Sequence, residues 1–299
     1  MEQNQENLQK ECTLCPRNCK IDRKSARGVC GASDEILISK VMLHMWEEPC
    51  ISGKNGSGAI FFSGCPLKCV YCQNKEISHT PSGKRVSVDD LAQIMLDLQK
   101  RGAHNVNLVT PTHYSDKIIE ALEKIKGELK IPVVYNTSGY ESSEQIKKIA
   151  EHVSVFLCDI KYFSPIASQK YSRAGDYYEV AKKAFATMLK AVGTPKYDEN
   201  GIMTSGVILR HLVLPSLRRD SIAIFEDVAK DLDVSSFVLS LMSQYTPEFC
   251  DESFPELKRR LTTFEYNSVL QRATKLGYTG YMQDFSSSTS IYTPNFDNN

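Results

Sequence analysis

The residues best suited to chemistry are three cysteines in the segment GCPLKCVYCQN, which spans residues 64–74. They are Cys65, Cys69 and Cys72, and they follow directly after an apolar run, AIFFS. Their C-x-x-x-C-x-x-C spacing places three thiolates on one short loop, where they can ligate three irons of a four-iron–four-sulfur cluster. The fourth iron then has no protein ligand. Because an open metal position can bind a substrate or cosubstrate directly, this spacing indicates a catalytic cluster rather than a closed site.

Two simpler interpretations compete with a cluster. His79 would complete a zinc site with the three cysteines, or the cysteines are reduced thiols in a loop. Tyr71 between the last two cysteines, and the apolar strand in front of them, favour the cluster.

A second set of four cysteines lies near the amino terminus, in the segment CTLCPRNCKIDRKSARGVC. Its members are Cys12, Cys15, Cys19 and Cys30. Four thiolates can close a tetrahedral zinc site or hold a second iron–sulfur cluster, and unmetallated thiols are the third alternative. A zinc site would only fold the segment, whereas a cluster could relay electrons. Nearby arginines would offset the negative charge of thiolates, although they are also ordinary surface residues: Arg17, Arg23 and Arg27.

Length and composition limit the class of protein. The 299 residues are enough for a single α/β barrel with a core of enzyme size. Lysine plus arginine and aspartate plus glutamate are both 36, and the resulting zero net charge gives nucleic-acid binding no support. No apolar run is long enough to span a bilayer, and the amino terminus lacks a secretory signal, so we expect a cytoplasmic protein without membrane contact. In such a reducing compartment the ten cysteines are expected to be metal ligands and core thiols.

Strand and helix signals alternate after the three-cysteine loop. The predicted strands are 59–63, 105–110, 131–139, 153–161, 206–215 and 237–242, and the predicted helices are 88–102, 116–127, 145–152, 177–192, 221–232 and 267–277. Ser87 is predicted to cap the first of these helices, and Ser142 with Gln145 to form a capping box on the third.

These six units predict an α/β fold, a partial (β/α)6 parallel barrel with a small N-terminal cysteine-rich metal-binding segment, because the strands are apolar on both faces. We expect three parts: the cysteine-rich segment 1–38, the barrel 39–285 and a flexible C-terminal tail 286–299.

In a parallel barrel the active site lies at the carboxyl ends of the strands. Within 153–161 the strand period of two puts Asp159 and Lys161 on the interior face and Cys158 on the opposite face, under the helices. The alternative is a buried ion pair that only holds the strand register.

The same argument on strand 206–215 groups His211 with Val207 and Leu209 on one face and puts Arg210 on the opposite face. A histidine on an apolar face is often a core residue, but its place near the strand end predicts a cosubstrate contact. Glu47 and Glu48, beside the only tryptophan, are either site carboxylates or solvated loop residues.

Segments between residues 40 and 250 resemble those of radical S-adenosylmethionine (SAM) enzymes. They are GCPLKCVYCQN, YNTSGY, DIKY, RHLVLP and MSQYTP, and they are similar to the activating enzymes of glycyl-radical proteins, such as pyruvate formate-lyase activating enzyme. The resemblance implies that SAM chelates the open iron through its amino and carboxylate groups, and that Tyr71 lies near the adenosyl group. It also implies a set of residues that hold the methionine carboxylate and ribose: Asn136, Thr137, Asp159, Lys161 and His211.

The activity implied by the resemblance is that of an oxidoreductase. An external reductant such as a flavodoxin or ferredoxin reduces the [4Fe-4S] cluster, SAM is cleaved to methionine and a 5′-deoxyadenosyl radical, and the radical abstracts hydrogen from a substrate. No residue is expected to act as an acid, base or nucleophile. The expected substrate is a glycyl-radical protein. The alternatives are a small molecule or other peptide, or a non-catalytic iron–sulfur or zinc protein.

The chain departs from that group in three places. Thr110-Pro111-Thr112-His113 stands where the group has a Gly-Gly-Glu segment that receives the SAM amino group, and Asn136 stands where it has an aspartate near a bound cation. The four amino-terminal cysteines have no counterpart in its best-known member. The sequence therefore resembles a branch of the group that has an extra cysteine set and need not share its substrate.

Overall fold

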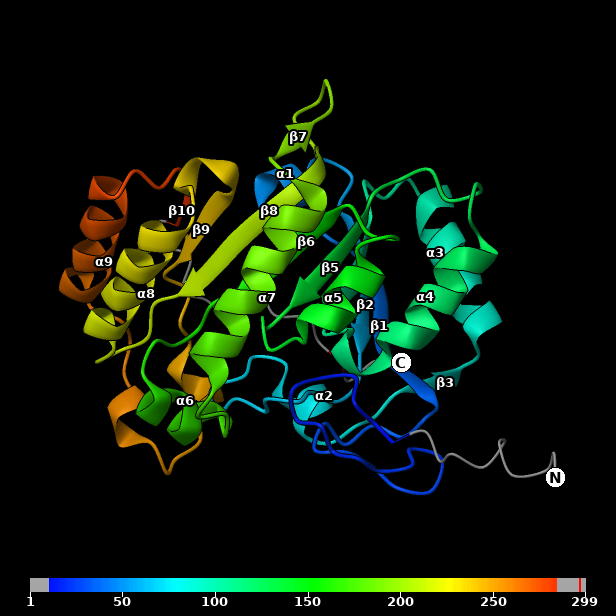
Figure 1. Cartoon of the computed structure of the whole chain (residues 1–299), viewed down its shortest axis with the longest axis horizontal. Helices are drawn as coiled ribbons and strands as arrows, with labels where there is room; N and C mark the ends of the chain where they lie inside the picture. Colours follow the sequence, from blue (N-terminus) through cyan, green and yellow to red (C-terminus); the bar gives the residue numbers. More distant parts are fainter. Residues whose placement is uncertain (1–10, 284–295, 297–299) are drawn as a thin grey trace, which may run out of the picture.

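The computed structural model of the protein describes residues 11–283 and residue 296 (Figure 1). Its centre is a sheet with the strand order β10-β9-β8-β6-β5-β4-β2-β1-β3. Every pairing from β10 to β2 in this order is parallel. The strands of this parallel part are β2 (Ser57–Phe62), β4 (Val106–Val109), β5 (Val133–Thr137), β6 (Val155–Asp159), β8 (Met203–Leu212), β9 (Val238–Met242) and β10 (Gly280–Met282).

Antiparallel strands complete the sheet at one edge. β1 (Ile36–His44) pairs with β2, and β3 (Lys84–Val86) pairs with β1. A short strand, β7 (Lys196–Tyr197), pairs with the start of β8. The short strands β3, β7 and β10, which have two or three residues each, are not among the predicted strands.

Helices follow the parallel strands in the predicted alternation, which confirms the six strand–helix units. They are α3 (Val88–Lys100), α4 (Ser115–Lys124), α5 (Ser143–Ile149), α7 (Tyr177–Val192), α8 (Arg218–Asp231) and α9 (Thr263–Lys275), with the short α1 (Pro49–Ser52), α2 (Lys75–His79) and α6 (Pro165–Ser172) in the connections. Ser87 caps α3 in a capping box with Asp90. Ser142 accepts a hydrogen bond from the Gln145 amide at the start of α5, but the Gln145 side chain donates to Ser115 instead of closing the predicted box.

Both faces of the parallel strands are buried, as predicted for a sheet covered by helices. On β6, Phe156 and Cys158 belong to the core under the helices, and Val155 and Leu157 belong to a separate cluster on the inner face. The alternation of the strand therefore directs every second side chain toward the interior of the barrel. The α/β fold with a mostly parallel sheet is confirmed.

The loops that carry the candidate site residues gather at the carboxyl ends of the parallel strands. In Figure 1 the amino-terminal segment, α2 and α6 lie together at the lower end, the end toward which the arrow of β8 points.

The division of the chain at residues 38 and 285 stays a prediction. Residues 1–10 and the predicted tail lie outside the described residues except for Phe296, whose ring packs edge-on against Phe61. In the described part of the chain, no helix combines the length and apolar character needed to cross a bilayer.

Candidate active site

The three-cysteine loop joins the end of β2 to α2 and lines a cavity of about 250 Å³ with Cys65, Cys69 and Cys72. Gly64 turns the chain into the loop with φ of +93°. A Cβ atom at this position would lie 2.7 Å from the carbonyl oxygen of Cys30. Only glycine therefore allows the loop to approach the amino-terminal segment so closely.

Each of the three sulfur atoms accepts a hydrogen bond from the protein. The amide of Leu67 donates to Cys65 Sγ at 3.4 Å, and two serine hydroxyls donate to the other sulfurs: Ser172 to Cys69 at 3.0 Å and Ser78 to Cys72 at 3.4 Å. Burial raises the pKa of the Cys65 thiol to about 12, with the neighbouring cysteines adding to the shift. A coordinated metal overcomes such a shift because it deprotonates the thiol outright. Three thiolates, each supported by a donor, fit three irons of one cluster.

The zinc alternative is not favoured by the position of His79. Its Nε2 lies 3.2 Å from the carbonyl oxygen of Cys69 and so contacts the backbone of the loop. In the described residues no three His, Cys, Asp or Glu side chains converge closely enough to hold a single metal ion.

Residues from the carboxyl ends of six different strands line the same cavity as the cysteines. They are Phe61, Val109, Asn136, Asp159, Arg210 and Met242, from β2, β4, β5, β6, β8 and β9. Thr137 and Lys161 line it too, and Tyr71 of the cysteine loop faces it. The parallel sheet brings these ends together, as expected for a barrel mouth.

Charged side chains form a connected network at the cavity. Arg210 donates from Nε to Asp159 Oδ1 at 2.9 Å, and Lys161 forms a salt bridge with the other oxygen of Asp159. Burial alone would raise the pKa of Asp159, but Arg210 and Lys161 outweigh it and lower that pKa below the ordinary value. Asp159 is therefore an anion at neutral pH. The face predicted for Asp159 and Lys161 is correct.

Glu47 extends this network from the opposite edge of the sheet. Its carboxylate accepts hydrogen bonds from Arg210 Nη1 at 3.1 Å, Asn136 Nδ2 at 3.2 Å and Asn107 Nδ2 at 3.0 Å. Arg210 also donates to Asn136 Oδ1 at 2.6 Å. Glu47 is thus a cavity carboxylate and not a solvated loop residue. Two cations, Arg210 and Lys161, face two carboxylates, Glu47 and Asp159.

His211 does not reach the cavity, and its predicted placement is wrong. The ring contacts the carbonyl oxygen of Ile160 through Nδ1 at 2.6 Å and the hydroxyl of Ser221 on α8 through Nε2 at 2.8 Å. Burial lowers its pKa to about 4, so the imidazole is neutral. Val207 and Leu209 do share its face, but that face lies under the helices, and the cavity residue of β8 is Arg210.

A chain of hydroxyl groups links the cavity to Cys69 of the three-cysteine loop. Tyr162 donates to the hydroxyl of Tyr71 at 2.7 Å, and the same Tyr162 oxygen lies 2.7 Å from Ser172 Oγ. Ser172 in turn donates to Cys69 Sγ. Tyr71 is therefore held by hydrogen bonding at the wall of the cavity, and its contact with an adenosyl group stays a prediction.

Glu141 ties together the loops after β4 and β5. One of its oxygens accepts hydrogen bonds from Thr112 and Thr137, both at 2.6 Å. Burial raises the pKa of Glu141 to about 7, and its other oxygen is buried without a partner. Thr110 of the TPTH segment lines the cavity with φ of +58°, and its amide donates to the carbonyl oxygen of Asn136 at 2.9 Å.

The comparisons with known proteins agree with this site. Residues 59–208 match the model of the radical SAM superfamily. The chain belongs to this superfamily. An uncharacterised protein of Methanocaldococcus jannaschii is 31% identical over 279 residues, which are 90% of this chain and 76% of that protein. The pyruvate formate-lyase-activating enzyme of Clostridium pasteurianum is 25% identical over 172 residues, which are 56% of this chain and 66% of the relative.

A solved structure supports the fold assignment. Streptococcus suis SuiB bound to S-adenosylmethionine superposes with a TM-score of 0.50 at 12% sequence identity, over 75% of this chain and 49% of SuiB. At this identity the likeness shows the fold alone. Membership of the superfamily implies a [4Fe-4S] cluster and SAM as cofactors, and an enzyme that cleaves SAM with the cluster.

Proposed function

We propose that this radical SAM enzyme activates a glycyl-radical protein. When bound, the reduced cluster and SAM supply a 5′-deoxyadenosyl radical, with methionine as the other product of the one-electron cleavage of the carbon–sulfur bond. Such a radical would take a hydrogen atom from a glycine Cα of the partner protein, which would give a glycyl radical and 5′-deoxyadenosine. The observation that carries the proposal is one cavity lined by three cysteines and a charge-balanced polar network, in a chain that is 25% identical over 172 residues to a pyruvate formate-lyase-activating enzyme.

The polar network suits the methionine part of SAM, which carries one carboxylate and one ammonium group. We assign the carboxylate to the cations Lys161 and Arg210, and the ammonium to the anions Asp159 and Glu47. Each of these side chains is 11–20% exposed, so water competes little for their charges. Binding would exchange internal ion pairs for ion pairs with SAM and leave few charges unpaired.

The remaining cavity residues suit the ribose and the adenine. Asn136 and Thr137 present polar groups at the end of β5, and we assign them to the ribose. Tyr71 is held by Tyr162 and offers an aromatic face beside the cysteines, where we place the adenosyl group. We assign His211 no contact with SAM, because it does not line the cavity and its ring contacts Ser221 on α8 instead.

No residue needs to act as an acid or base in this reaction. The side chains bind and orient SAM and exclude water from a reactive radical. The electron comes from a reductant outside the chain, and we propose a flavodoxin or ferredoxin for this role. The glycyl-radical protein is the second partner, proposed from the relative in Clostridium pasteurianum.

The test has two stages. Anaerobically reconstituted protein, reduced with dithionite, is expected to convert SAM to methionine and 5′-deoxyadenosine, and Cys69→Ala is expected to lose this activity. The protein is then mixed with candidate glycyl-radical proteins, and the electron paramagnetic resonance spectrum is recorded. A glycyl radical supports the proposal. SAM cleavage with no radical on any candidate protein would overturn the assigned substrate.

The TPTH segment favours a second candidate, a small molecule or another peptide as substrate. Thr110 lines the cavity at the place where activating enzymes have a Gly-Gly-Glu segment, so the cavity wall differs from theirs. Cleavage of SAM that is accelerated by a small metabolite or short peptide, and not by a glycyl-radical protein, would support this candidate.

A further inference from the structure

The segment that precedes the barrel, residues 11–34, has little to hold it in one conformation. It contains no helix and no strand, only an isolated bridge between Glu11 and Asp22. Its buried side chains are Cys15, Cys30 and Ala32, so two of the three are cysteines. A segment of this length without regular structure or an apolar core generally needs a disulfide or a metal to fold.

The backbone of this segment nevertheless follows a defined path. The amide of Cys12 donates to Ile21 O at 2.9 Å and the amide of Lys20 donates to Cys12 O at 3.1 Å, which brings the chain back on itself. Asn18 and Lys20 have φ of +43° and +50°, in the left-handed region that non-glycine residues rarely adopt. Such residues persist where the surroundings fix them.

This path brings Cys19 and Cys30 to the same glycine. A Cβ atom on Gly28 would lie 3.4 Å from Cys19 Sγ and 3.5 Å from Cys30 Sγ, so the two sulfurs flank the same glycine. The amide of Val29 donates to Cys19 Sγ at 3.5 Å. The amide of Asn18 donates to the carbonyl oxygen of Cys15 at 3.0 Å, which closes a turn directly before Cys19.

We propose that Cys12, Cys15, Cys19 and Cys30 ligate one metal centre, a zinc ion or an iron–sulfur cluster, and that this centre braces the catalytic loop. Both centres prefer four thiolates. A zinc ion requires the four sulfur atoms to lie closer to one point than they do here. A loop without helix or strand can make the small movement that brings them closer. A cluster accepts wider spacing, because each thiolate binds a separate iron.

The bracing role rests on contacts that cross from this segment to the three-cysteine loop. The carbonyl oxygen of Cys30 accepts a hydrogen bond from the amide of Cys65 at 3.1 Å, so a ligand of one centre holds a ligand of the other. Arg17 donates to Pro66 O at 2.8 Å and to Ser172 O at 3.0 Å. Ser172 is the residue whose hydroxyl donates to Cys69 Sγ.

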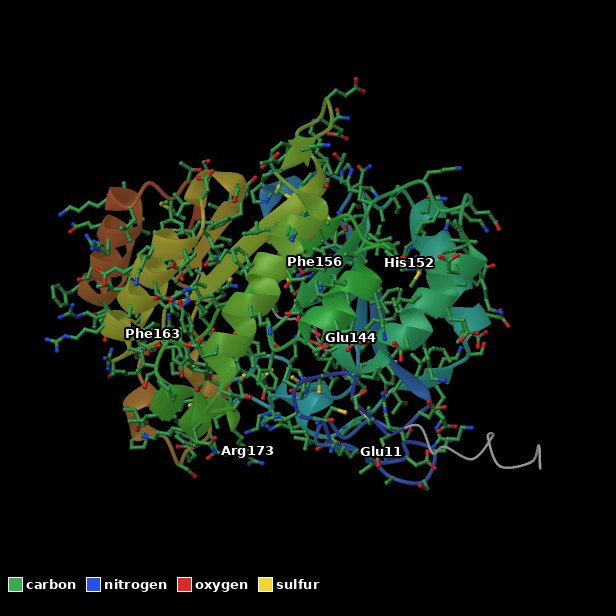
Figure 2. All side chains as sticks on the ribbon, in the orientation of Figure 1. Glu11, Glu144, His152, Phe156, Phe163 and Arg173 are labelled. Carbon is green, nitrogen blue, oxygen red and sulfur yellow. The ribbon has the colours of Figure 1, made fainter. Side chains whose placement is uncertain are left out.

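Figure 2 shows this neighbourhood at the lower end of the molecule. Several sulfur atoms, drawn in yellow, gather there between the amino-terminal segment and α2, with Glu11 and Arg173 labelled on either side. The carbonyl of Arg173 accepts a further hydrogen bond from Arg17. Metal bound by the four cysteines would fix Cys30 and Arg17, and through them Cys65 and Ser172.

Metal analysis of two variants tests the ligand set. In the variant Cys65→Ala/Cys69→Ala/Cys72→Ala, any remaining centre belongs to the four cysteines. We expect about one zinc or about four irons per chain, and the ratio of the two metals shows whether the centre is a zinc ion or an iron–sulfur cluster. A triple variant that folds but binds neither zinc nor iron would overturn the proposal. In Cys15→Ser the second centre is expected to be lost, while the control Cys50→Ala, which removes a buried thiol outside both sets, retains it.

A variant of Arg17 tests the brace without touching a cysteine. Arg17→Gln removes the contacts to Pro66, Ser172 and Arg173 and leaves all seven thiolates in place. We expect full metal content after reconstitution. A chelator should remove the catalytic cluster at least about threefold faster than in wild type, and the visible absorbance of the cluster measures this rate. The second centre should be lost at the wild-type rate. An unchanged rate for the catalytic cluster would refute the brace, whatever substrate the enzyme proves to have.

Discussion

Two cysteine-rich loops meet at the carboxyl ends of the strands, and their surroundings differ. Cys65, Cys69 and Cys72 line a cavity beside charged residues from the barrel strands. The four amino-terminal cysteines do not line that cavity and sit in a segment without helix or strand. We propose that the same ligand chemistry serves two purposes: three thiolates at a cavity would leave an iron open for reaction, whereas four thiolates away from it would close a centre that organises the chain.

The largest effect that sharpens this comparison is loss of one cavity thiolate. Cys69→Ala is expected to reduce SAM cleavage to the background of uncatalysed decay, because the cluster loses one of only three protein ligands. Chromatographic measurement of 5′-deoxyadenosine checks this. Cys50→Ala serves as the matched control and should retain activity within about twofold, since Cys50 is buried within α1 and lies outside both sets. Equal activity of Cys69→Ala and wild type would show that the loop is not the catalytic one.

A large effect on SAM binding is also expected when the charged network loses Arg210. The neighbouring residue on β8, His211, provides the comparison. Arg210→Gln leaves Asp159 and Glu47 without their shared cation, and truncation of one partner of a buried ion pair typically costs about 3–5 kcal/mol. We expect SAM to bind at least about 100-fold more weakly, equivalent to about 3 kcal/mol.

The control for that experiment is His211→Gln, one residue further along the strand. Its side chain lies under α8, so SAM affinity should remain within about threefold, while the melting temperature falls because two buried hydrogen bonds change. Equilibrium dialysis with labelled SAM separates the two outcomes. Equal weakening of SAM binding in both variants would contradict the assignment of Arg210 to the cavity and of His211 to the core.

Arg210 and His211 also show how much of the site could be predicted from the sequence. Cysteine spacing and the strand period are local signals, and they identified the loop whose cysteines line the cavity and the interior face of Asp159 and Lys161. On β8 both faces are apolar, so the pattern alone does not reveal which face opens on the cavity. The register decides, because Arg210 and Asp159 are directly paired across β8 and β6.

Other site residues depend on contacts that no local pattern encodes. Glu47 meets Arg210 across 163 positions of the chain, and Arg17 meets Ser172 across 155. The sequence offered Glu47 only as one of two acids beside Trp46. The role of Arg17 was visible only as a positive charge near thiolates. Tertiary folding, and not residue type, selects these side chains for the site.

A moderate effect is expected from Glu141, which supports the loops beside the cavity. Its pKa is raised from 4.5 to about 7 by burial, so between these values the folded protein binds more protons than the unfolded chain. Stability from this group is therefore complete below about pH 4.5 and is lost as pH rises through 7, by up to about 3 kcal/mol. Glu141→Gln should remove this dependence, which melting temperatures recorded from pH 5 to pH 8 would reveal. Parallel pH profiles for the two proteins would exclude the shift.

The smallest expected effect concerns the hydroxyl that reaches Cys69 from α6. Ser172→Ala removes a hydrogen bond to sulfur, which should lower the reduction potential of the cluster because such bonds stabilise the more negative reduced state. A bond of about 1 kcal/mol corresponds to about 40 mV for one electron. Ser168→Ala on the same helix is the control, since Ser168 donates to Pro165 O. A redox titration that finds equal potentials would remove Ser172 from the tuning of the cluster.

The central claim is that the three-cysteine loop, and not the four-cysteine segment, holds the cluster that reacts with SAM. Electron paramagnetic resonance of the reduced protein with and without SAM tests it most directly, in wild type, in Cys65→Ala/Cys69→Ala/Cys72→Ala and in Cys15→Ser. SAM should change the cluster spectrum in wild type and in any folded Cys15→Ser protein that retains its catalytic cluster, and it should change nothing in the triple variant. A SAM-dependent spectrum that survives in the triple variant would contradict the account.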